Sequence, residues 1–397
     1  MTLDLTKIVS ELRRAVALAV AHAQSGAGEF VDLLRRFDDT EVLQRVEEAR
    51  TSWLLAVALG RYFARYGVPE FHPVNYSCVA TDGSIVASDR HGPLHYAIVN
   101  IGYCVLEYGP HPRARLGAEP TVLWKDEDLW ITDGARRIPV TGAALAARRA
   151  VMELETGLRL CGDVQSPVAV LQDGTLIPWG LEGQTGPVVA WALERFATVL
   201  QEYRQRKIPV AGIISYPGSR DVVNVLRVAA CDYPQLGRAV DCDDCLARVQ
   251  RGERHQACRI VPDVTDRWLF GRFEGIQLSP GERSACYRSR STILRQLPEE
   301  DQIVFFYLHT GSEIARVEMP LWIAADHRLL EAIHGIIWDQ CCRARGYPLA
   351  LQEAHEQAVV HREERLQIEA IVDQLFADAG LIQERSAKER SKRVRFA

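Results

Sequence analysis

The chain changes its hydrophobic period at about residue 76, and this change limits its fold more than any other feature. Apolar residues there alternate or run continuously, as in strands, and short polar or Gly/Pro links separate the runs. The strand-like runs cover 76–87, 95–108 and 121–132. Helical and strand-like patterns then alternate: a helix at about 142–161, a strand at 167–172, a helix at about 188–206 and a strand at 209–215. This order predicts an α/β fold, with a mixed sheet flanked by helices.

Residues 1–70 have a helical pattern instead. Ile8, Leu12 and Val16 recur at helical spacing, and a second helical pattern runs from Thr40 through Val57. Two helices with apolar faces and no sheet of their own need a partner surface. The rest of the chain or a second copy can supply it, and dimerisation through this N-terminal helical region is slightly favoured.

Residues 71–380 are predicted to form one domain that contains the mixed sheet. An insertion at 231–262 interrupts it, because this segment is polar, contains cysteines and lacks apolar periodicity. Regular structure returns with strands at 302–309 and 314–323 and with helices at about 327–344 and 349–377. The charged tail, 381–397, is predicted to be disordered.

Composition limits the classes of function. The chain has 397 residues, of which 47% are hydrophobic, so it can bury a sizeable core. It has no apolar run of the ~18–20 residues that a membrane helix needs and no signal-peptide pattern at its N-terminus, so a cytoplasmic location without membrane contact is expected. A net charge of -5 argues against binding nucleic acid by bulk electrostatics. It does not exclude an enzyme that gathers carboxylates to hold cations.

Two Asp-Gly pairs follow apolar strand-like runs. Asp82 ends the run Val79–Asp82 before Gly83, and Asp173 ends the run Val168–Asp173 before Gly174. Either pair alone also fits a β-turn, because Asp-Gly is common in hairpins. Two of them at neighbouring strand ends would place two hard oxygen ligands within reach of one metal ion.

A helical carboxylate is a third candidate ligand. Glu153 and Glu155 both lie on the predicted helix before the second strand; Glu155 is beside its apolar stripe, and Glu153 is nearer Ala150 and Gly157. Spacing alone does not choose between them. Either one also fits an exposed salt bridge to a nearby arginine.

The segment Gly346-Tyr347-Pro348 followed by His355 is the most distinctive stretch of the chain. Its proline lies near the start of a predicted helix, where a missing N–H costs little. His355 follows Tyr347 by about two turns, so a histidine that binds metal or moves a proton would lie on the same side as a tyrosine that orients phosphate or water. His355 alone also fits a packed polar residue.

In this order, the two Asp-Gly strand ends, the helical glutamate and the Gly-Tyr-Pro segment with its histidine resemble the NurA family of nucleases over about residues 76–365. The resemblance implies a ribonuclease-H-like catalytic core. It also implies homodimers that act on DNA ends with Mn²⁺ or Mg²⁺ beside the hexameric translocase HerA.

Carried onto this sequence, the resemblance implies catalytic and metal-binding roles for particular residues. The metal aspartates correspond to Asp82 and Asp173, and the tyrosine and histidine to Tyr347 and His355. Glu153 is the favoured glutamate, with Glu155 as the alternative. Arg365, on the helix after His355, is expected to contact backbone phosphate.

Four cysteines in the insertion depart from the family's minimal pattern. Cys242 and Cys245 form a Cys-x-x-Cys pair, with Cys231 and Cys258 on either side. Four thiolates fit tetrahedral Zn²⁺ or an iron–sulfur cluster. The irregular outer spacings equally fit a loop with unligated thiols, and Cys-x-x-Cys also fits redox chemistry.

The resulting hypothesis is hydrolysis of DNA phosphodiesters by bound divalent ions, in repair or in defence against foreign DNA. Resection from 5′ to 3′ is implied by the resemblance, and cutting inside single strands is an alternative. A different class of function is a catalytically weak subunit that loads DNA onto a translocase. A glycosidase built on a carboxylate pair is a third class, which insensitivity to chelators would reveal.

Overall fold

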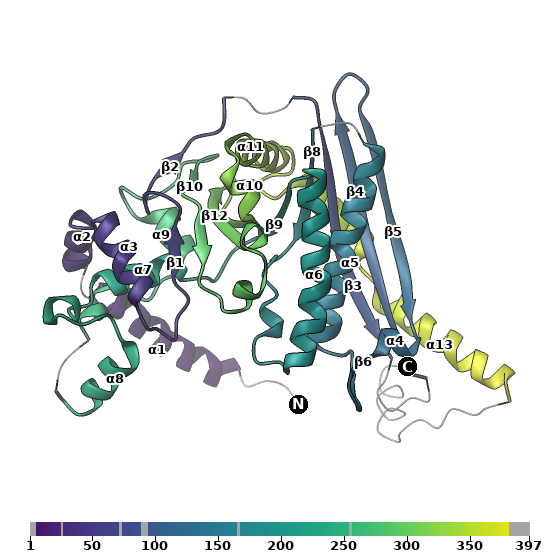
Figure 1. The fold of residues 1–397 in the computed structure, drawn as a ribbon, viewed down its shortest axis with the longest axis horizontal. Coiled ribbons are helices and arrows are strands. Elements are labelled where there is room, and N and C mark those ends of the chain that lie inside the picture. Colours follow the sequence, from purple (N-terminus) through teal and green to yellow (C-terminus); the bar gives the residue numbers. More distant parts are fainter. Residues whose placement is uncertain are drawn as a thin grey trace. The chain divides into compact units, whose positions relative to one another are not determined.

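The computed structural model describes residues 5–24, 27–70, 74–88, 94–164, 167–253 and 256–380 (Figure 1). They form two compact units. The first contains the described residues up to Val68, Ile214–Leu294 and Ile303–Glu318, and the second contains Pro69–Ile213, Arg295–Gln302 and the described residues from Met319 onward. The tail predicted at 381–397 lies outside the described residues.

The second unit is built on a mixed sheet. Its strands are β3 (Tyr76–Ala87), β4 (Ala97–Tyr108), β5 (Arg113–Leu123), β8 (Val168–Asp173) and β9 (Val210–Ile214). Strands β3, β4 and β5 form an antiparallel meander, whereas β8 is parallel to β3 and β9 is parallel to β8. The spatial order is therefore β9-β8-β3-β4-β5. The expected mixed sheet flanked by helices is confirmed.

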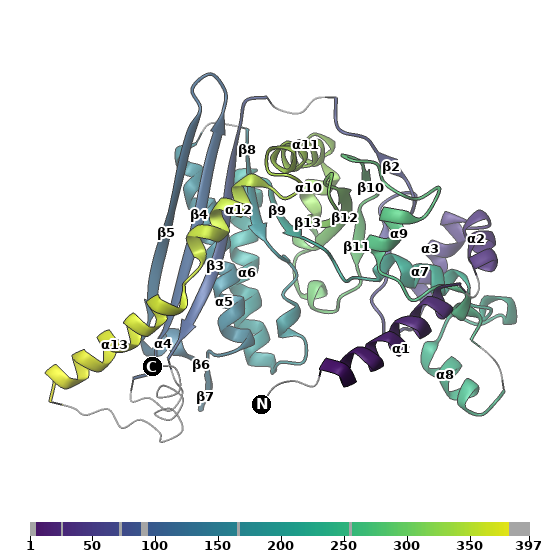
Figure 2. The same cartoon turned by 180° about the vertical axis from the view of Figure 1, so that it is seen from behind.

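Helices cover both faces of this sheet. Helices α5 (Ala143–Leu160) and α6 (Gly186–Arg206) lie on one face, and α12 (Leu349–Ala358) crosses β3 and β4 on the other (Figures 1 and 2). Helix α5 packs through Val151, Leu154 and Leu158, which recur at helical spacing and are all buried. The remaining elements of the unit are α4 (Asp126–Leu129), β6 (Trp130–Asp133), β7 (Arg136–Pro139), η1 (Cys161–Asp163), η2 (Trp179–Leu181), η6 (Glu299–Asp301), α10 (Leu321–Ala325), α11 (His327–Arg343) and α13 (Arg362–Asp378).

The first unit combines the N-terminal segment with segments from the second half of the chain. Its helices are α1 (Leu5–Gln24), α2 (Ala27–Arg35), α3 (Asp39–Glu48), α7 (Asp221–Ala229), η3 (Pro234–Leu236), α8 (Cys242–Gln250), η4 (Ala257–Ile260) and α9 (Asp266–Arg272), with η5 (Ile293–Gln296) at its boundary. Its strands are β1 (Ala56–Ala58), β2 (Arg65–Tyr66), β10 (Arg283–Ser284), β11 (Tyr287–Ser289), β12 (Ile303–His309) and β13 (Ile314–Pro320). Aromatic rings fill the core, where Phe270 stacks on Tyr307 with centroids 5.0 Å apart.

The helical prediction for 40–57 is wrong beyond Glu48. After α3 the chain pairs with the segment before α8, because Arg50 N donates to Val240 O and Cys242 N donates to Arg50 O. It then forms β1 and β2, so tertiary pairing overrides the local helical spacing. Val42 and Val46 of α3 are buried in the first unit's core, so the rest of the chain is the partner surface for this helix.

Three further predictions of elements need correction. Strand β5 runs from Arg113 to Leu123, so the strand-like run predicted at 121–132 covers only its end and is followed by α4 and β6. Strand β13 ends at Pro320, after which α10 begins. The helix predicted at 349–377 is two helices, α12 and α13. No helix among the described residues is both long enough and apolar enough to cross a membrane.

Candidate metal centre

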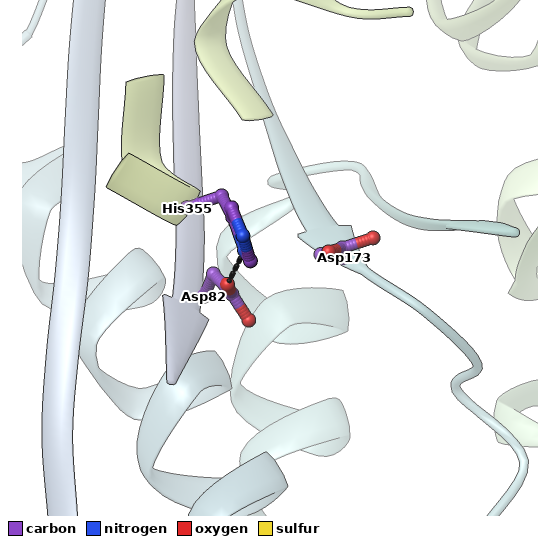
Figure 3. A group of neighbouring side chains, drawn as sticks. All are labelled: Asp82, Asp173 and His355. Atoms are coloured by element: carbon purple, nitrogen blue, oxygen red, sulfur yellow. Dashed lines mark hydrogen bonds and ion pairs between the residues drawn. The ribbon is translucent and has the colours of Figure 1, made fainter. Parts of the chain in front are cut away.

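Parallel pairing of β3 and β8 brings Asp82 and Asp173 together. Thr81 is in register with Gln172, and the two aspartates are the next residues on their strands. Equivalent positions on paired parallel strands face the same side of the sheet. Ligand atoms of Asp82, Asp173 and His355 all lie within 4.8 Å of one another (Figure 3).

Asp82 is not at a strand end, contrary to expectation. Strand β3 continues through Gly83 to Ala87, so no turn forms there, whereas β8 does end at Asp173. Position 83 requires glycine for a reason other than a turn, because a Cβ on Gly83 would lie 2.5 Å from Glu153 Oε1. The glycine therefore makes room for the third carboxylate.

Helix α12 and the loop before it supply the histidine and the tyrosine. His355 Nδ1 lies 2.7 Å from Asp82 Oδ2, and the Tyr347 hydroxyl donates to Asp173 Oδ1 at 2.7 Å. The hydrogen bond to Asp82 raises the pKa of His355, which remains half exposed. Burial raises the pKa of Asp173, and the Asp82 charge raises it further, while the tyrosine hydrogen bond opposes the shift.

Glu153 lies behind the two aspartates and is fully buried. Its Oε2 accepts a hydrogen bond from Gln172 Nε2 at 2.6 Å, and its Oε1 lies 3.0 Å from Arg149 Nη1. Arg149 Nη1 is also 3.8 Å from Asp82 Oδ1 and donates to Gly83 O. Burial raises the pKa of Glu153 to about 8, against the opposing effect of Arg149.

The structure separates the two candidate glutamates. Glu155 is on the exposed side of α5, where it lines a charged groove together with Arg195 and Glu202 of α6. Arg365 is exposed on α13, and its Nε donates to Val360 O. Neither residue belongs to the acidic cluster, whereas Asp82, Glu153, Asp173, Tyr347 and His355 converge in it. The catalytic roles of all these residues stay predictions.

Two contributors to the cluster were not singled out from the sequence. Arg149 lies four residues before Glu153 on a helix, and this spacing is the signal that the two side chains meet. Gln172 is the last residue of the strand predicted at 167–172. A polar residue within the apolar run that ends at Asp173 is the signal that would have identified it.

The four cysteines of the insertion lie in the first unit and are partly buried. Cys242 and Cys245 are in the first turn of α8, Cys258 is in η4 and Cys231 follows α7. Burial raises the pKa of Cys242 to about 12, and the thiols of Cys258, Cys231 and Cys245 add to the shift, so the four are near one another. Among the described residues, however, only the Asp82 group has three or more ligand atoms within 4.8 Å. A metal at the cysteines stays a prediction.

The acidic cluster fits a divalent cation. Its carboxylate oxygens and imidazole nitrogen are ligands that Mg²⁺ and Mn²⁺ accept. Glu153 Oε1 is buried without a hydrogen bond, although Arg149 is near. Three carboxylates share one arginine and one histidine as counter-charges, and Asp82 raises the pKa of both Glu153 and Asp173. A bound cation would relieve this repulsion.

The fold and the site together define an α/β protein with a mixed sheet and a candidate acidic metal site. A family profile described as the NurA domain matches residues 76–360. The chain therefore belongs to the NurA family.

Comparison with curated proteins finds no match. Among solved structures, a crystal structure of NurA is 12% identical, covers 77% of this chain and 90% of its own, and gives a TM-score of 0.37. Drosophila Piwi is 10% identical, with 73% of this chain and 30% of its own covered and a TM-score of 0.29. A type 1 RNase H with the type 2 active-site motif, LC9-RNase H1, is 16% identical, with 48% and 87% covered and a TM-score of 0.21. The family assignment rests on the domain match.

Proposed function

We propose that the chain is a divalent-metal-dependent deoxyribonuclease. The observation that carries this proposal is the convergence of Asp82, Asp173 and His355, with their ligand atoms within 4.8 Å of one another. These three residues would hold Mn²⁺ or Mg²⁺, with Glu153 beside them. Such an ion, when bound, activates water and stabilises the charge that develops on the phosphate.

The surrounding residues hold the carboxylates in place. Tyr347 fixes the orientation of Asp173 by donating a hydrogen bond to it, and Gln172 does the same for Glu153. Arg149 lies between Asp82 and Glu153 and offsets part of their negative charge. His355 is oriented by Asp82, and its half-exposed ring is accessible for binding an ion or carrying a proton.

Membership of the NurA family supports the wider setting. We propose action on DNA ends as a homodimer, by resection from 5′ to 3′, by cutting within single strands, or by both. The proposed partner is a HerA-type hexameric translocase. Arg365, exposed on α13, is proposed to contact backbone phosphate.

The test is degradation of end-labelled linear DNA by purified protein with Mn²⁺. Asp82→Asn should lower the rate by more than about 100-fold, and Glu153→Gln by about 10- to 100-fold, because loss of a residue behind metal ligands typically costs 10–100-fold. Glu155→Gln is the matched control: it changes the same residue type two positions along α5, on the exposed side, and should retain activity. Activity in the Asp82→Asn protein equal to that of the unaltered protein would reject the assignment.

A further inference from the structure

A hollow of about 290 Å³ adjoins the acidic cluster in the second unit. Its walls come from α5, from the segment that follows β8 and from α6. Arg149, Gln172 and Asp173 line this hollow and also take part in the acidic cluster. A molecule with a phosphate at the cluster would therefore have the hollow beside that phosphate.

Small side chains of α5 create the space. Ala143, Ala146, Ala147 and Ala150 recur at helical spacing along the wall of the hollow. The opposite lining is apolar and includes Ile177, Pro178, Trp179 and Phe196. The volume is close to the lower end of the ~300–1,000 Å³ range of ligand sites, so the hollow has room for one base and its sugar and none for a duplex.

One polar atom in this lining lacks a partner. Gln172 is 2% exposed, and its Nε2 donates to Glu153. Its Oε1 is buried and has no hydrogen bond among the described residues. A buried acceptor without a donor costs ~1–3 kcal/mol, so a ligand N–H or O–H group would stabilise a bound molecule if the Gln172 side chain turned its Oε1 towards the hollow.

We propose that the hollow receives the base and sugar of the nucleotide next to the scissile phosphate, in an unstacked conformation. This inference rests on the proposed nuclease function. An apolar wall binds the face of any base, and a single acceptor at Gln172 cannot distinguish four base edges, so cutting is independent of sequence. A base must leave its stack to enter, so single strands and frayed ends are preferred over paired duplex.

The first test uses the unaltered protein. Single-turnover cleavage with Mn²⁺ is measured on oligothymidylate and on the same strand with one abasic site at a defined position. Cleavage of the bond beside the abasic site should slow by about 10- to 100-fold, since stacking on one base is worth ~1–3 kcal/mol. Bonds elsewhere should be cut at the normal rate. Equal rates at every bond would overturn the inference.

The second test fills the hollow. Ala147 lines the hollow, so Ala147→Phe places a ring in it. Ala190→Phe is a matched control at an exposed alanine of α6 that does not line the hollow. The Ala147→Phe protein should cut the bond beside an intact base as slowly as the unaltered protein cuts the bond beside the abasic site. Its own rate at the abasic site should equal that of the unaltered protein. Ala190→Phe should behave as the unaltered protein. An Ala147→Phe protein that still prefers the bond beside an intact base would contradict the proposal.

The two proposals fail in different ways. Should the unaltered protein cut DNA in an Asp82-dependent manner but ignore the loss of a base, the hollow is not a base site and the nuclease function stands. Should it cut no DNA with Mn²⁺, the nuclease function fails, and the inference about the hollow fails with it.

Discussion

At the scale of single residues, Glu153 ties the acidic cluster to the stability of the protein. Burial raises the pKa of this carboxyl from 4.5 to about 8 in the metal-free protein. Between these two pH values the folded chain holds a proton that the unfolded chain releases. Stability contributed by this group is therefore complete below about pH 4.5 and is lost as the pH rises towards 8.

Glu153→Gln should remove this dependence on pH. In EDTA, the free energy of unfolding of the variant should match that of the unaltered protein near pH 5. At pH 8 the free energy of unfolding of the variant should exceed that of the unaltered protein by on the order of a few kcal/mol, because the amide does not ionise. Urea unfolding across this pH range measures the difference. Glu155→Gln, on the exposed side of α5, should show a much smaller change with pH, and a constant difference for Glu153→Gln would contradict the assigned pKa.

The residues of the cluster differ in how far the sequence could identify them. Asp82 and Asp173 each follow an apolar run and precede glycine, so their proximity was predictable from the expectation that their strands are neighbours. The choice between Glu153 and Glu155 was not predictable, because helical spacing alone does not show which of the two the sheet covers. Only the position of α5 over β3 shows which carboxylate is enclosed.

At the scale of elements, the contact between β4 and α12 positions His355. A Cβ on Gly102 of β4 would lie 2.3 Å from Ala358 N and 2.4 Å from Ala354 O, which are backbone atoms of α12. Backbone atoms cannot rotate away as a side chain can. The glycine therefore permits the helix to approach the sheet closely enough for His355 to reach Asp82.

Gly102→Ala should displace α12 and weaken the hydrogen bond between His355 and Asp82. Excess volume in a packed interior typically costs ~1–3 kcal/mol, so the melting temperature should fall by several degrees and Mn²⁺ affinity should fall with it. Differential scanning calorimetry and metal titration measure the two effects. Gly186→Ala is the control, because a Cβ there meets nothing within 4 Å. Equal melting temperatures for both variants would refute the role assigned to Gly102.

A separate prediction concerns zinc binding by the four cysteines of the segment around α8. If the four thiols bind zinc, protein purified without added metal should contain about one zinc ion per chain by mass spectrometry. Cys242→Ser should lose that zinc, while Asp82→Asn and the exposed Cys342→Ser should keep it. Zinc loss should also speed proteolysis between 231 and 262, because this segment has few apolar side chains. If the protein purified under reducing conditions contains no zinc, the four thiols do not bind it.

Elements with strong periodicity were predictable, and short ones were not. The boundaries expected for β3, α5, β8, α6 and β9 agree with the structure to within two residues. In the first unit, β1, β2, β10 and β11 are two or three residues long and are held by pairing with distant segments. No local pattern of that length distinguishes a strand from a loop.

At the scale of the whole molecule, the site depends on contacts between residues far apart in the chain. His355 and Asp82 are separated by 273 positions, and Tyr347 and Asp173 by 174. Spacing along the sequence contains no information about such pairs. Their order nevertheless matched a known family, and this resemblance supplied what periodicity could not.

The N-terminal helix leaves an apolar surface without a partner in the described chain. On α1, Leu5, Leu12 and Val16 are 65%, 57% and 60% exposed, although apolar residues recur there at helical spacing. Scattered exposed apolar residues are ordinary, but a stripe along one helix indicates an interaction surface. This stripe suits the homodimer proposed from the family.

Light scattering coupled to size-exclusion chromatography should therefore give twice the chain mass of 44.5 kDa. Leu12→Glu combined with Val16→Glu should give the mass of one chain, because two charges in a buried apolar contact cost more than the contact contributes. Leu375→Glu, which changes a leucine of α13 that is 62% exposed, should leave the dimer intact. A dimer that survives the α1 changes but separates with Leu375→Glu would move the interface to α13 and leave α1 for another partner.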